Sequence, residues 1–210
     1  MNKEYKVEFE IAGPAAMFTR PDSGAAPISY PAPTFSAVRG ICDSILRFET
    51  AFIEPIKVEI CAPIRYHKYT TNYGGPERKG QQIKKGNSFQ LNATILVDVC
   101  YKIYGKAVER SSYKGDKTTN PLHYLQDKFL TRLKKGQFYE TPCLGWKEFV
   151  PTYIGQFRET SKVIKDIQII LPSMLYSIYT EKGSIEHHYK QNVFIQNGIL
   201  DFSNLKKEDK

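Results

Sequence analysis

Alternating apolar and polar residues predict a strand over residues 5–11 and a second strand over residues 56–60. Residues 89–103 keep the same alternation for longer than most strands last, which predicts one long, bent strand. Residues 64–87 are basic, rich in tyrosine and glycine and poor in aliphatic side chains, so we expect them at an exposed hairpin tip. A hairpin of about residues 64–104 is therefore predicted to protrude from the sheet.

A first helix is predicted after Pro33, where apolar residues take up helical spacing up to Leu46. Thr34 or Ser36 can serve as its N-cap, because a hydroxyl there accepts a hydrogen bond from the first turn. Gly40 lies inside this helix, where glycine costs about 1 kcal/mol relative to alanine. We expect that Gly40 allows close approach to a neighbouring backbone.

A second helix is predicted to begin at Asn120-Pro121 and to end at Gly136. Its apolar residues form one stripe, which we expect to face the core. Lys128, Arg132 and Lys135 follow at intervals of four and three on the opposite side. These three charges share a face that either binds RNA or keeps the helix solvated.

The last third of the chain reads as β-structure, with strands over residues 167–171 and 174–180 and a hairpin at Asn197-Gly198. The order strand, helix, strand, long strand, helix before it is compatible with a ferredoxin-like fold. The predicted fold class is α+β: a ferredoxin-like (RRM-like) amino-terminal domain, residues 1–150, with a protruding β-hairpin. Residues 151–210 are expected to form a small antiparallel β domain.

Charge and cysteine content narrow the class of partner. Thirty Lys and Arg against 22 Asp and Glu give a formal charge of +8, which favours a polyanionic partner. The four cysteines lie far apart, without zinc-ligand spacing, and are expected to be reduced thiols in a cytoplasmic protein. Because no apolar run approaches the roughly 20 residues that span a bilayer, we expect no membrane segment. No metal site and no cofactor are predicted.

His123 is the histidine best placed for chemistry, in the first turn of the second predicted helix. An imidazole transfers protons near neutral pH, and Asp127, one turn later, can orient or charge it. The positive end of the helix acts in the opposite sense and favours the neutral ring. A structural or merely exposed histidine is the alternative, and His187-His188 are read as a solvated loop.

Six motifs in order resemble the Cas5 subunit of type I-C (subtype c/d) CRISPR systems, a family of the RAMP superfamily. They are GPAAMFTRPDSG, SYPAPTFSAVRGICDSI, NPLHYL, KKGQFYETPCLGWKEF, MLYSIYT and FIQNGILDF. The resemblance implies an RNA-binding protein that grips the repeat-derived 5′ handle of CRISPR RNA within the Cascade surveillance complex. It also implies the backbone and large Cascade subunits as partners, with target DNA as a further one.

The resemblance further implies metal-independent cleavage of precursor CRISPR RNA at the base of the repeat hairpin, by attack of a ribose 2′-hydroxyl on the adjacent phosphate. In the family, a tyrosine, a lysine and a histidine assist this reaction. Here Leu46 occupies the expected tyrosine position, and Leu122 precedes the matching His123. Tyr66, Tyr124, Lys68 or Lys128 can substitute, and our catalytic candidates are His123, Tyr124 and Lys128.

Two functional hypotheses lie within the family, and a third lies outside it. The chain is an endoribonuclease that stays on its product, or a catalytically inactive assembly subunit that binds the 5′ handle; a generic RNA-binding module is the third. Exposed cations and aromatics suit RNA recognition, because cations neutralise phosphates while rings stack on bases; a solvated charged hairpin is the alternative. The candidate RNA-binding residues are Arg20, Tyr30, Arg39, Arg65, Tyr66, Lys68, Lys84, Lys85, Arg132, Lys135, Trp146 and Lys147.

Overall fold

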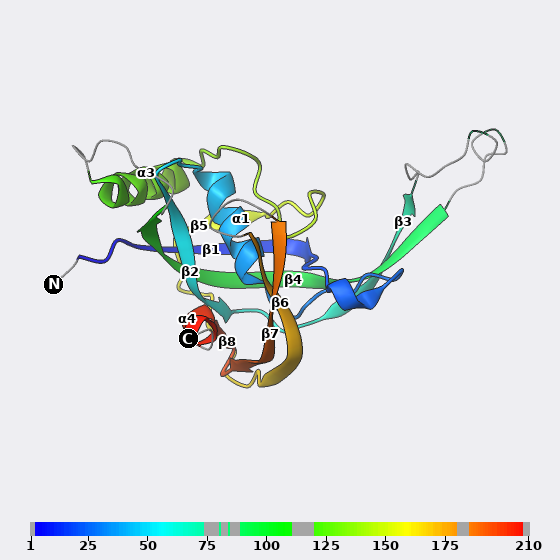
Figure 1. Ribbon diagram of the computed structural model, residues 1–210. Coiled ribbons are helices and arrows are strands. Elements are labelled where there is room, and N and C mark those ends of the chain that lie inside the picture. The colour runs from blue at the N-terminus through cyan, green and yellow to red at the C-terminus, as the bar shows by residue number, and fades with distance from the viewer. Residues whose placement is uncertain are drawn as a thin grey trace.

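An eight-stranded antiparallel sheet runs through the protein in the order β5-β1-β4-β2-β8-β7-β6, with β3 paired to β4 (Figure 1). The computed structural model describes residues 3–73, 80, 84, 89–110, 120–179 and 185–207. The strands are β1 (Lys6–Ala16), β2 (Ala51–Ile60), β3 (Tyr66–Tyr73), β4 (Phe89–Glu109), β5 (Tyr153–Gly155), β6 (Ile169–Tyr179), β7 (Ile185–Gln196) and β8 (Ile199–Asp201). The helices are η1 (Pro21–Ser23), α1 (Phe35–Ile45), α3 (Pro121–Lys135) and α4 (Phe202–Lys207). The predicted α+β class is confirmed.

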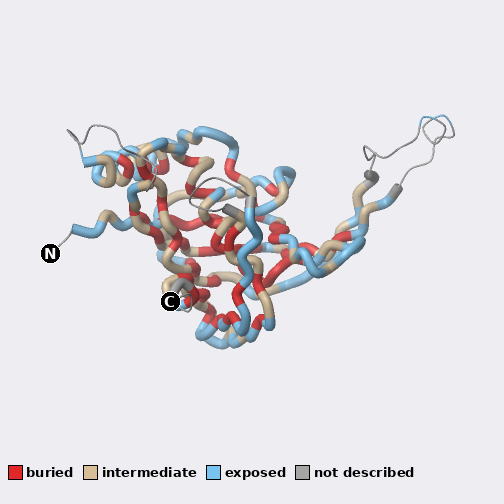
Figure 2. Tube along the Cα trace, in the orientation of Figure 1, coloured by how far each residue is buried: buried red, intermediate tan, exposed pale blue. Residues whose placement is uncertain are grey.

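The predicted long strand is β4, and it belongs both to a protruding arm and to the central sheet. Its first part pairs with β3, from Tyr73↔Phe89 to Tyr66↔Leu96, and its remainder pairs with β1 and β2. Asp98, with φ of 51°, lies where β4 leaves the arm. Figure 2 shows buried residues concentrated in the central sheet, whereas the arm is largely intermediate and exposed.

Helix α1 begins as predicted at Thr34, whose Oγ1 accepts a hydrogen bond from the Ala37 amide at 3.2 Å. Its buried positions are Phe35, Val38, Ile41, Cys42 and Ile45. The expectation that Gly40 approaches a neighbouring backbone is wrong: this residue is exposed, and a Cβ there would meet nothing within 4 Å. The buried stripe passes on the other side of the helix, which leaves Gly40 toward solvent.

One face of the central strands packs against the helices. Val7, Phe9 and Ile11 of β1 are fully buried, and the Phe9 ring lies 5.7 Å from the ring of Phe129 on α3. Leu125, Phe129 and Leu133 form the buried stripe of α3. Because residues of opposite parity on β1 point to the other side, Glu8 and Glu10 face away from the helices.

The opposite face of β1 holds a buried carboxylate. The Glu10 side chain has no exposed surface and accepts hydrogen bonds from Arg158 Nε at 2.6 Å, the Arg158 amide at 2.9 Å and Ser161 Oγ at 2.7 Å. Burial would raise the pKa of Glu10, but the hydrogen bonds from Arg158 and Ser161 lower it below its ordinary value. These bonds attach residues 158–161 to the sheet.

Replacing Glu10 by glutamine is expected to lower the free energy of unfolding at neutral pH by about 1–3 kcal/mol, because a charge-assisted pair is lost. A lowered folded-state pKa means that ionised Glu10 stabilises the fold above its unfolded pKa. This contribution disappears as the pH falls through the folded pKa, so wild type and variant converge in acid. Urea unfolding across this pH range measures the effect, with exposed Glu8→Gln as the matched control. A constant difference at all pH values would contradict it.

The carboxy-terminal strands differ in part from the prediction. Residues 167–171 and 174–180 were expected as two strands, but β6 runs through Pro172 without a break, which an edge strand tolerates because its outer amides need no partner. His187 and His188 lie in strand β7, not in the predicted loop. The turn at Asn197-Gly198 is confirmed, with φ of 52° and 72° at these residues.

Strands from both sides of residue 150 share the sheet, because β8 pairs with β2 and β5 pairs with β1. The division into domains at that residue stays a prediction.

In the described part of the chain, helices are too short or too polar to cross a lipid bilayer.

Candidate nucleic-acid interface

The amino-terminal end of α3 is held in place by its cap. Asn120 Oδ1 accepts hydrogen bonds from the amides of Leu122 at 3.0 Å and His123 at 3.3 Å, and Pro121 occupies the first turn. The Asn120 amide also donates to the Tyr5 hydroxyl at 3.0 Å. Because the stripe from Leu125 onward faces the core, the other faces of these first two turns remain open to solvent.

His123 is exposed, and its ring meets the Tyr5 ring edge-on at 5.8 Å between centroids. The chain just before β1 thus supports the imidazole from one side, while solvent reaches the other. Asp127, one turn further along α3, is also exposed. A polar substrate on this surface has access to both side chains.

Tyr124 and Lys128 share the adjacent face of α3, since they lie four residues apart. Lys128 Nζ lies 5.5 Å from the centroid of the Tyr124 ring, and this ring is 45% exposed. The Tyr124 ring also contacts the Phe48 ring at 5.4 Å, just beyond the end of α1. The structure therefore places all three catalytic candidates on the first two turns of one helix.

Leu46 ends α1 and packs against the core, so it adds no polar group to this surface. The Tyr139 amide donates to the carbonyls of Ser44 at 2.8 Å and Ile45 at 3.3 Å, which brings the chain after α3 to the end of α1. Tyr139 is 55% exposed. Two phenols thus lie near Leu46 in the fold: Tyr139, through these backbone bonds, and Tyr124, through Phe48.

Tyr5, Phe48 and Tyr139 were not among the site residues predicted from the sequence. Phe48 and Tyr139 occupy irregular segments, and Tyr5 was read only as the start of a strand. The one available signal was Gly136, which adopts the left-handed conformation with φ of 62° and turns the chain back toward α1. A pattern of local spacing carries no information about that return.

The base of the arm brings together several RNA-binding candidates. Arg65 is exposed and pairs with Asp98 at 2.9 Å, and the neighbouring Tyr66 is 47% exposed. Burial raises the pKa of Tyr66, and the positive charge of Arg20 acts in the opposite direction. Arg20 itself forms a two-pronged pair with Asp22 at 3.1 and 2.7 Å. Lys68 follows on β3 and is exposed.

Tyr30 belongs to the core, contrary to its selection as an RNA-binding residue. The residue is 2% exposed, and its hydroxyl accepts a hydrogen bond from the Leu175 amide at 3.0 Å. Burial raises its pKa above the ordinary tyrosine value. A ring in this position anchors β6 and does not stack on a nucleobase.

Trp146 is half-buried, and two contacts fix its ring. The indole Nε1 donates to Thr19 Oγ1 at 3.0 Å, and the ring stacks on Phe149 at 5.9 Å with an interplanar angle of 8°. Lys147, next in the chain, is exposed. The two residues present a fixed ring edge and an adjacent exposed charge on the loop after α3.

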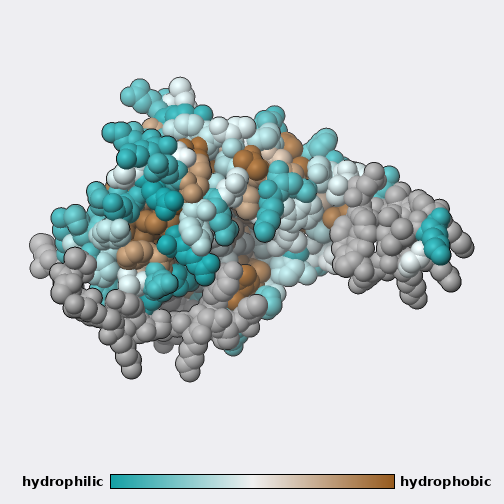
Figure 3. All heavy atoms as spheres, turned by 90° about the horizontal axis from the view of Figure 1, so that it is seen from above, coloured by the Kyte–Doolittle hydropathy of each residue, from teal (hydrophilic) through white to brown (hydrophobic). Residues whose placement is uncertain are grey.

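The remaining candidates lie on separate elements. Arg132 is half-exposed and Lys135 is exposed in the last turns of α3, where cations also stabilise the negative end of the helix. Arg39 of α1 lies over the Phe52 ring. Lys84 is exposed, and Lys85 lies outside the described residues. Viewed from above, the part of the molecule that includes α3 shows hydrophilic side chains with hydrophobic ones between them (Figure 3).

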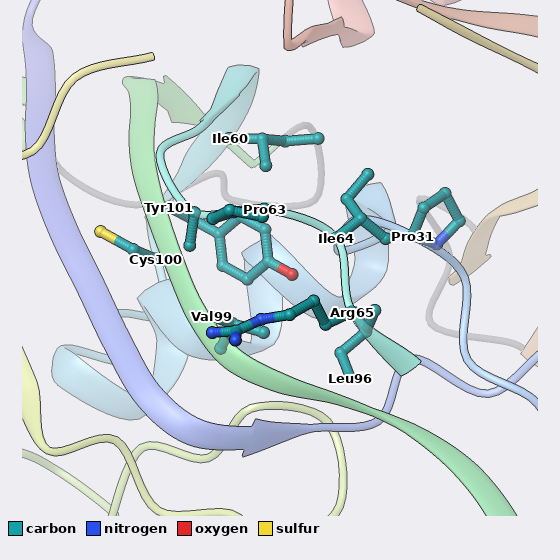
Figure 4. A pocket seen from close by; sticks show the side chains of 10 residues that line it. Pro31, Ile60, Pro63, Ile64, Arg65, Leu96, Val99, Cys100 and Tyr101 are labelled. Carbon is teal, nitrogen blue, oxygen red and sulfur yellow. The ribbon is translucent and has the colours of Figure 1, made fainter. Parts of the chain in front are cut away.

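A small pocket lies where β2 leads into the arm, with Arg65 and Tyr101 among its lining residues (Figure 4). Its cavity volume of about 10 Å³ leaves room for little more than one water molecule, far below the roughly 300–1,000 Å³ of typical ligand sites. Most other lining residues are apolar, including Pro31, Ile60 and Leu96. An extended polyanion therefore has more to contact on the outer surfaces of α3 and the arm than in this pocket.

Comparison with known proteins decides the family. The family model described as "CRISPR-associated protein (Cas_Cas5)" matches residues 7–167. The chain belongs to the Cas5 family. A relative from Mannheimia succiniciproducens, named "CRISPR pre-crRNA endoribonuclease Cas5d", is 29% identical over 93% of this Cas5 chain and 94% of its own length. A relative of the same name from Thermus thermophilus is 29% identical over 71% of this chain and 63% of its own.

Solved structures agree on the Cas5 fold. One titled "Crystal Structure of CRISPR-associated Protein" has a TM-score of 0.72 at 19% identity and covers 96% of this chain and 94% of its own. A functionally uncharacterized protein from Streptococcus mutans has a TM-score of 0.70 at 18% identity, with the same coverage. The resemblance to Cas5 proteins of the I-C type, inferred from sequence motifs, is confirmed.

Proposed function

We propose that this Cas5 chain cuts precursor CRISPR RNA at the base of the repeat hairpin without a metal ion. The observation that carries the proposal is the grouping of His123, Tyr124 and Lys128 on the exposed first turns of α3. The relatives named pre-crRNA endoribonuclease support the same reaction. The order of β1, α1, β2, β4 and α3 supports a ferredoxin-like arrangement beneath this surface.

The reaction needs proton transfer and charge stabilisation, but no cofactor. The ribose 2′-oxygen attacks the adjacent phosphorus and loses its proton, while the bond from phosphorus to the 5′-oxygen breaks and that oxygen gains a proton. The products carry a 2′,3′-cyclic phosphate and a 5′-hydroxyl. His123 suits one of the two proton transfers, Lys128 the negative charge that develops on the phosphate, and Tyr124 the second transfer or substrate positioning.

After cleavage, the protein is proposed to keep the 5′ handle as a subunit of Cascade, next to the backbone and large subunits. Exposed cations on α3 and at the base of the arm supply phosphate contacts, and Tyr66 and Trp146 offer rings to unpaired bases. Target DNA is a further partner in this proposal.

A handle-binding subunit without nuclease activity is the second candidate function. Leu46 and Leu122 favour it, because both aliphatic side chains pack against the core at positions where the family resemblance expects a tyrosine and a lysine. In that case the same surface retains RNA but cannot move the 2′-hydroxyl proton.

Incubation of the purified protein with its cognate repeat RNA in EDTA tests the proposal. We expect one cut at the hairpin base and a cyclic phosphate at the new 3′ end. A repeat RNA with a single 2′-deoxy nucleotide on the 5′ side of the cut is the matched control and should stay intact, because it lacks the nucleophile. Tight binding of the ordinary repeat without cleavage would overturn the nuclease and support the second candidate.

A further inference from the structure

Two arginines from distant parts of the chain lie over a single aromatic ring. The guanidinium carbon of Arg39 on α1 lies 4.3 Å from the centroid of Phe52 on β2, and that of Arg110, just after β4, lies 5.3 Å from it. A guanidinium group over an aromatic ring is attracted to the ring face, and guanidinium groups are also the usual partners of planar anions. Phe52 therefore holds two guanidinium groups next to one ring.

These arginines continue into the catalytic candidates on α3. Arg110 Nε donates to the Phe48 carbonyl at 3.3 Å, and its amide donates to the Thr50 carbonyl at 2.9 Å. The Phe48 ring contacts the ring of Tyr124, beside Lys128. The alternation of cationic groups and rings thus extends from α1, through the segment before β2, to the first turns of α3.

A third arginine adds to the positive potential here. Arg47 is exposed in the turn after α1. Burial raises the pKa of Asp43, and the charges of Arg39, Arg110 and Arg47 lower it only in part, so its carboxylate is a weak counter-charge to them. Burial thus outweighs the three positive charges in setting the pKa of Asp43.

We propose that Arg39, Arg47 and Arg110 bind backbone phosphates of the RNA strand next to the site of cleavage. This inference deepens the proposed function and rests on it. Guanidinium groups bind phosphate in a two-pronged manner, and neighbouring half-exposed rings suit an unpaired RNA strand. The surface places that strand so that it leads from α1 to His123, Tyr124 and Lys128.

Salt dependence separates phosphate contact from a purely structural role of these arginines. Affinity for the cognate repeat RNA is measured by fluorescence anisotropy between about 50 and 200 mM salt for wild type, Arg47→Gln and Arg110→Gln. Each lost contact should weaken binding and lower the slope of log affinity against log salt by about 0.7–0.9. Lys165→Gln removes an exposed charge from the segment packed against the β7–β8 turn, and is expected to keep the wild-type slope.

Arg47 makes the test independent of folding, because its exposed side chain can change without disturbing the contacts of Phe52. A wild-type slope in both arginine variants would contradict the proposed phosphate contacts. If wild type binds the repeat without cutting it while the slope still falls in the variants, the proposed phosphate contacts are supported and the proposed nuclease activity is contradicted. If wild type cuts the repeat and the slopes do not change in the variants, only the proposed phosphate contacts are contradicted.

Discussion

Replacement of His123 by alanine is expected to slow repeat cleavage by about 100- to 10,000-fold, the usual loss when a proton-transfer group is removed. The affinity for repeat RNA should change little, since the proposed phosphate contacts lie on other residues. The side chain is exposed, so the free energy of unfolding should stay within about 0.5 kcal/mol of wild type. Single-turnover cleavage with RNA-saturated enzyme measures the chemical step.

The control for this variant is His188→Ala, which removes an exposed imidazole from β7 that lies 3.7 Å from Glu186. It should cut at the wild-type rate. Equal rates for His123→Ala and wild type would show that α3 does not supply the proton-transfer group, even if the RNA is cut.

Gly145→Ala is expected to lower the free energy of unfolding by about 2–5 kcal/mol, through backbone strain and overpacking together. Gly145 has φ of 93°, and a Cβ there would lie 1.8 Å from the carbonyl oxygen of Met17. The Met17 amide also donates to the Leu144 carbonyl at 2.9 Å, so the segments around Met17 and Gly145 are held close together. Alanine must push them apart.

The matched control is Gly24→Ala, because Gly24 also has a positive φ, 61°, but a Cβ there meets nothing within 4 Å. Only the conformational cost remains, about 1–3 kcal/mol for a sparsely populated backbone conformation. Urea unfolding of both variants measures the difference. Equal losses would show that the contact with Met17 is not what requires glycine at position 145.

Helix ends were predictable from sequence because their signals are local. Thr34 and Asn120 accept amide hydrogen bonds from the first turns of α1 and α3, and Gly136 ends α3 in the left-handed conformation. The Asn197-Gly198 turn is predictable for the same reason, since both central residues need positive φ. These features depend on a few neighbouring residues.

The surface around His123 was only partly predictable, because its neighbours come from other elements. Tyr5 reaches His123 from the chain before β1, and Phe48 reaches Tyr124 from the turn after α1. Tyr30 shows the opposite failure: in the sequence it reads as an exposed aromatic residue, but β6 covers it. Such contacts follow from the order of strands in the sheet, which single-residue patterns do not encode.

Strand β4 connects the protruding arm to the central sheet. Its 21 residues span about 70 Å, and one continuous backbone carries the arm at one end and pairs with β1 and β2 at the other. Asp98, where β4 leaves the arm, combines a positive φ with the Arg65 ion pair. The arm and the sheet that supports α3, which carries His123, thus depend on one continuous strand.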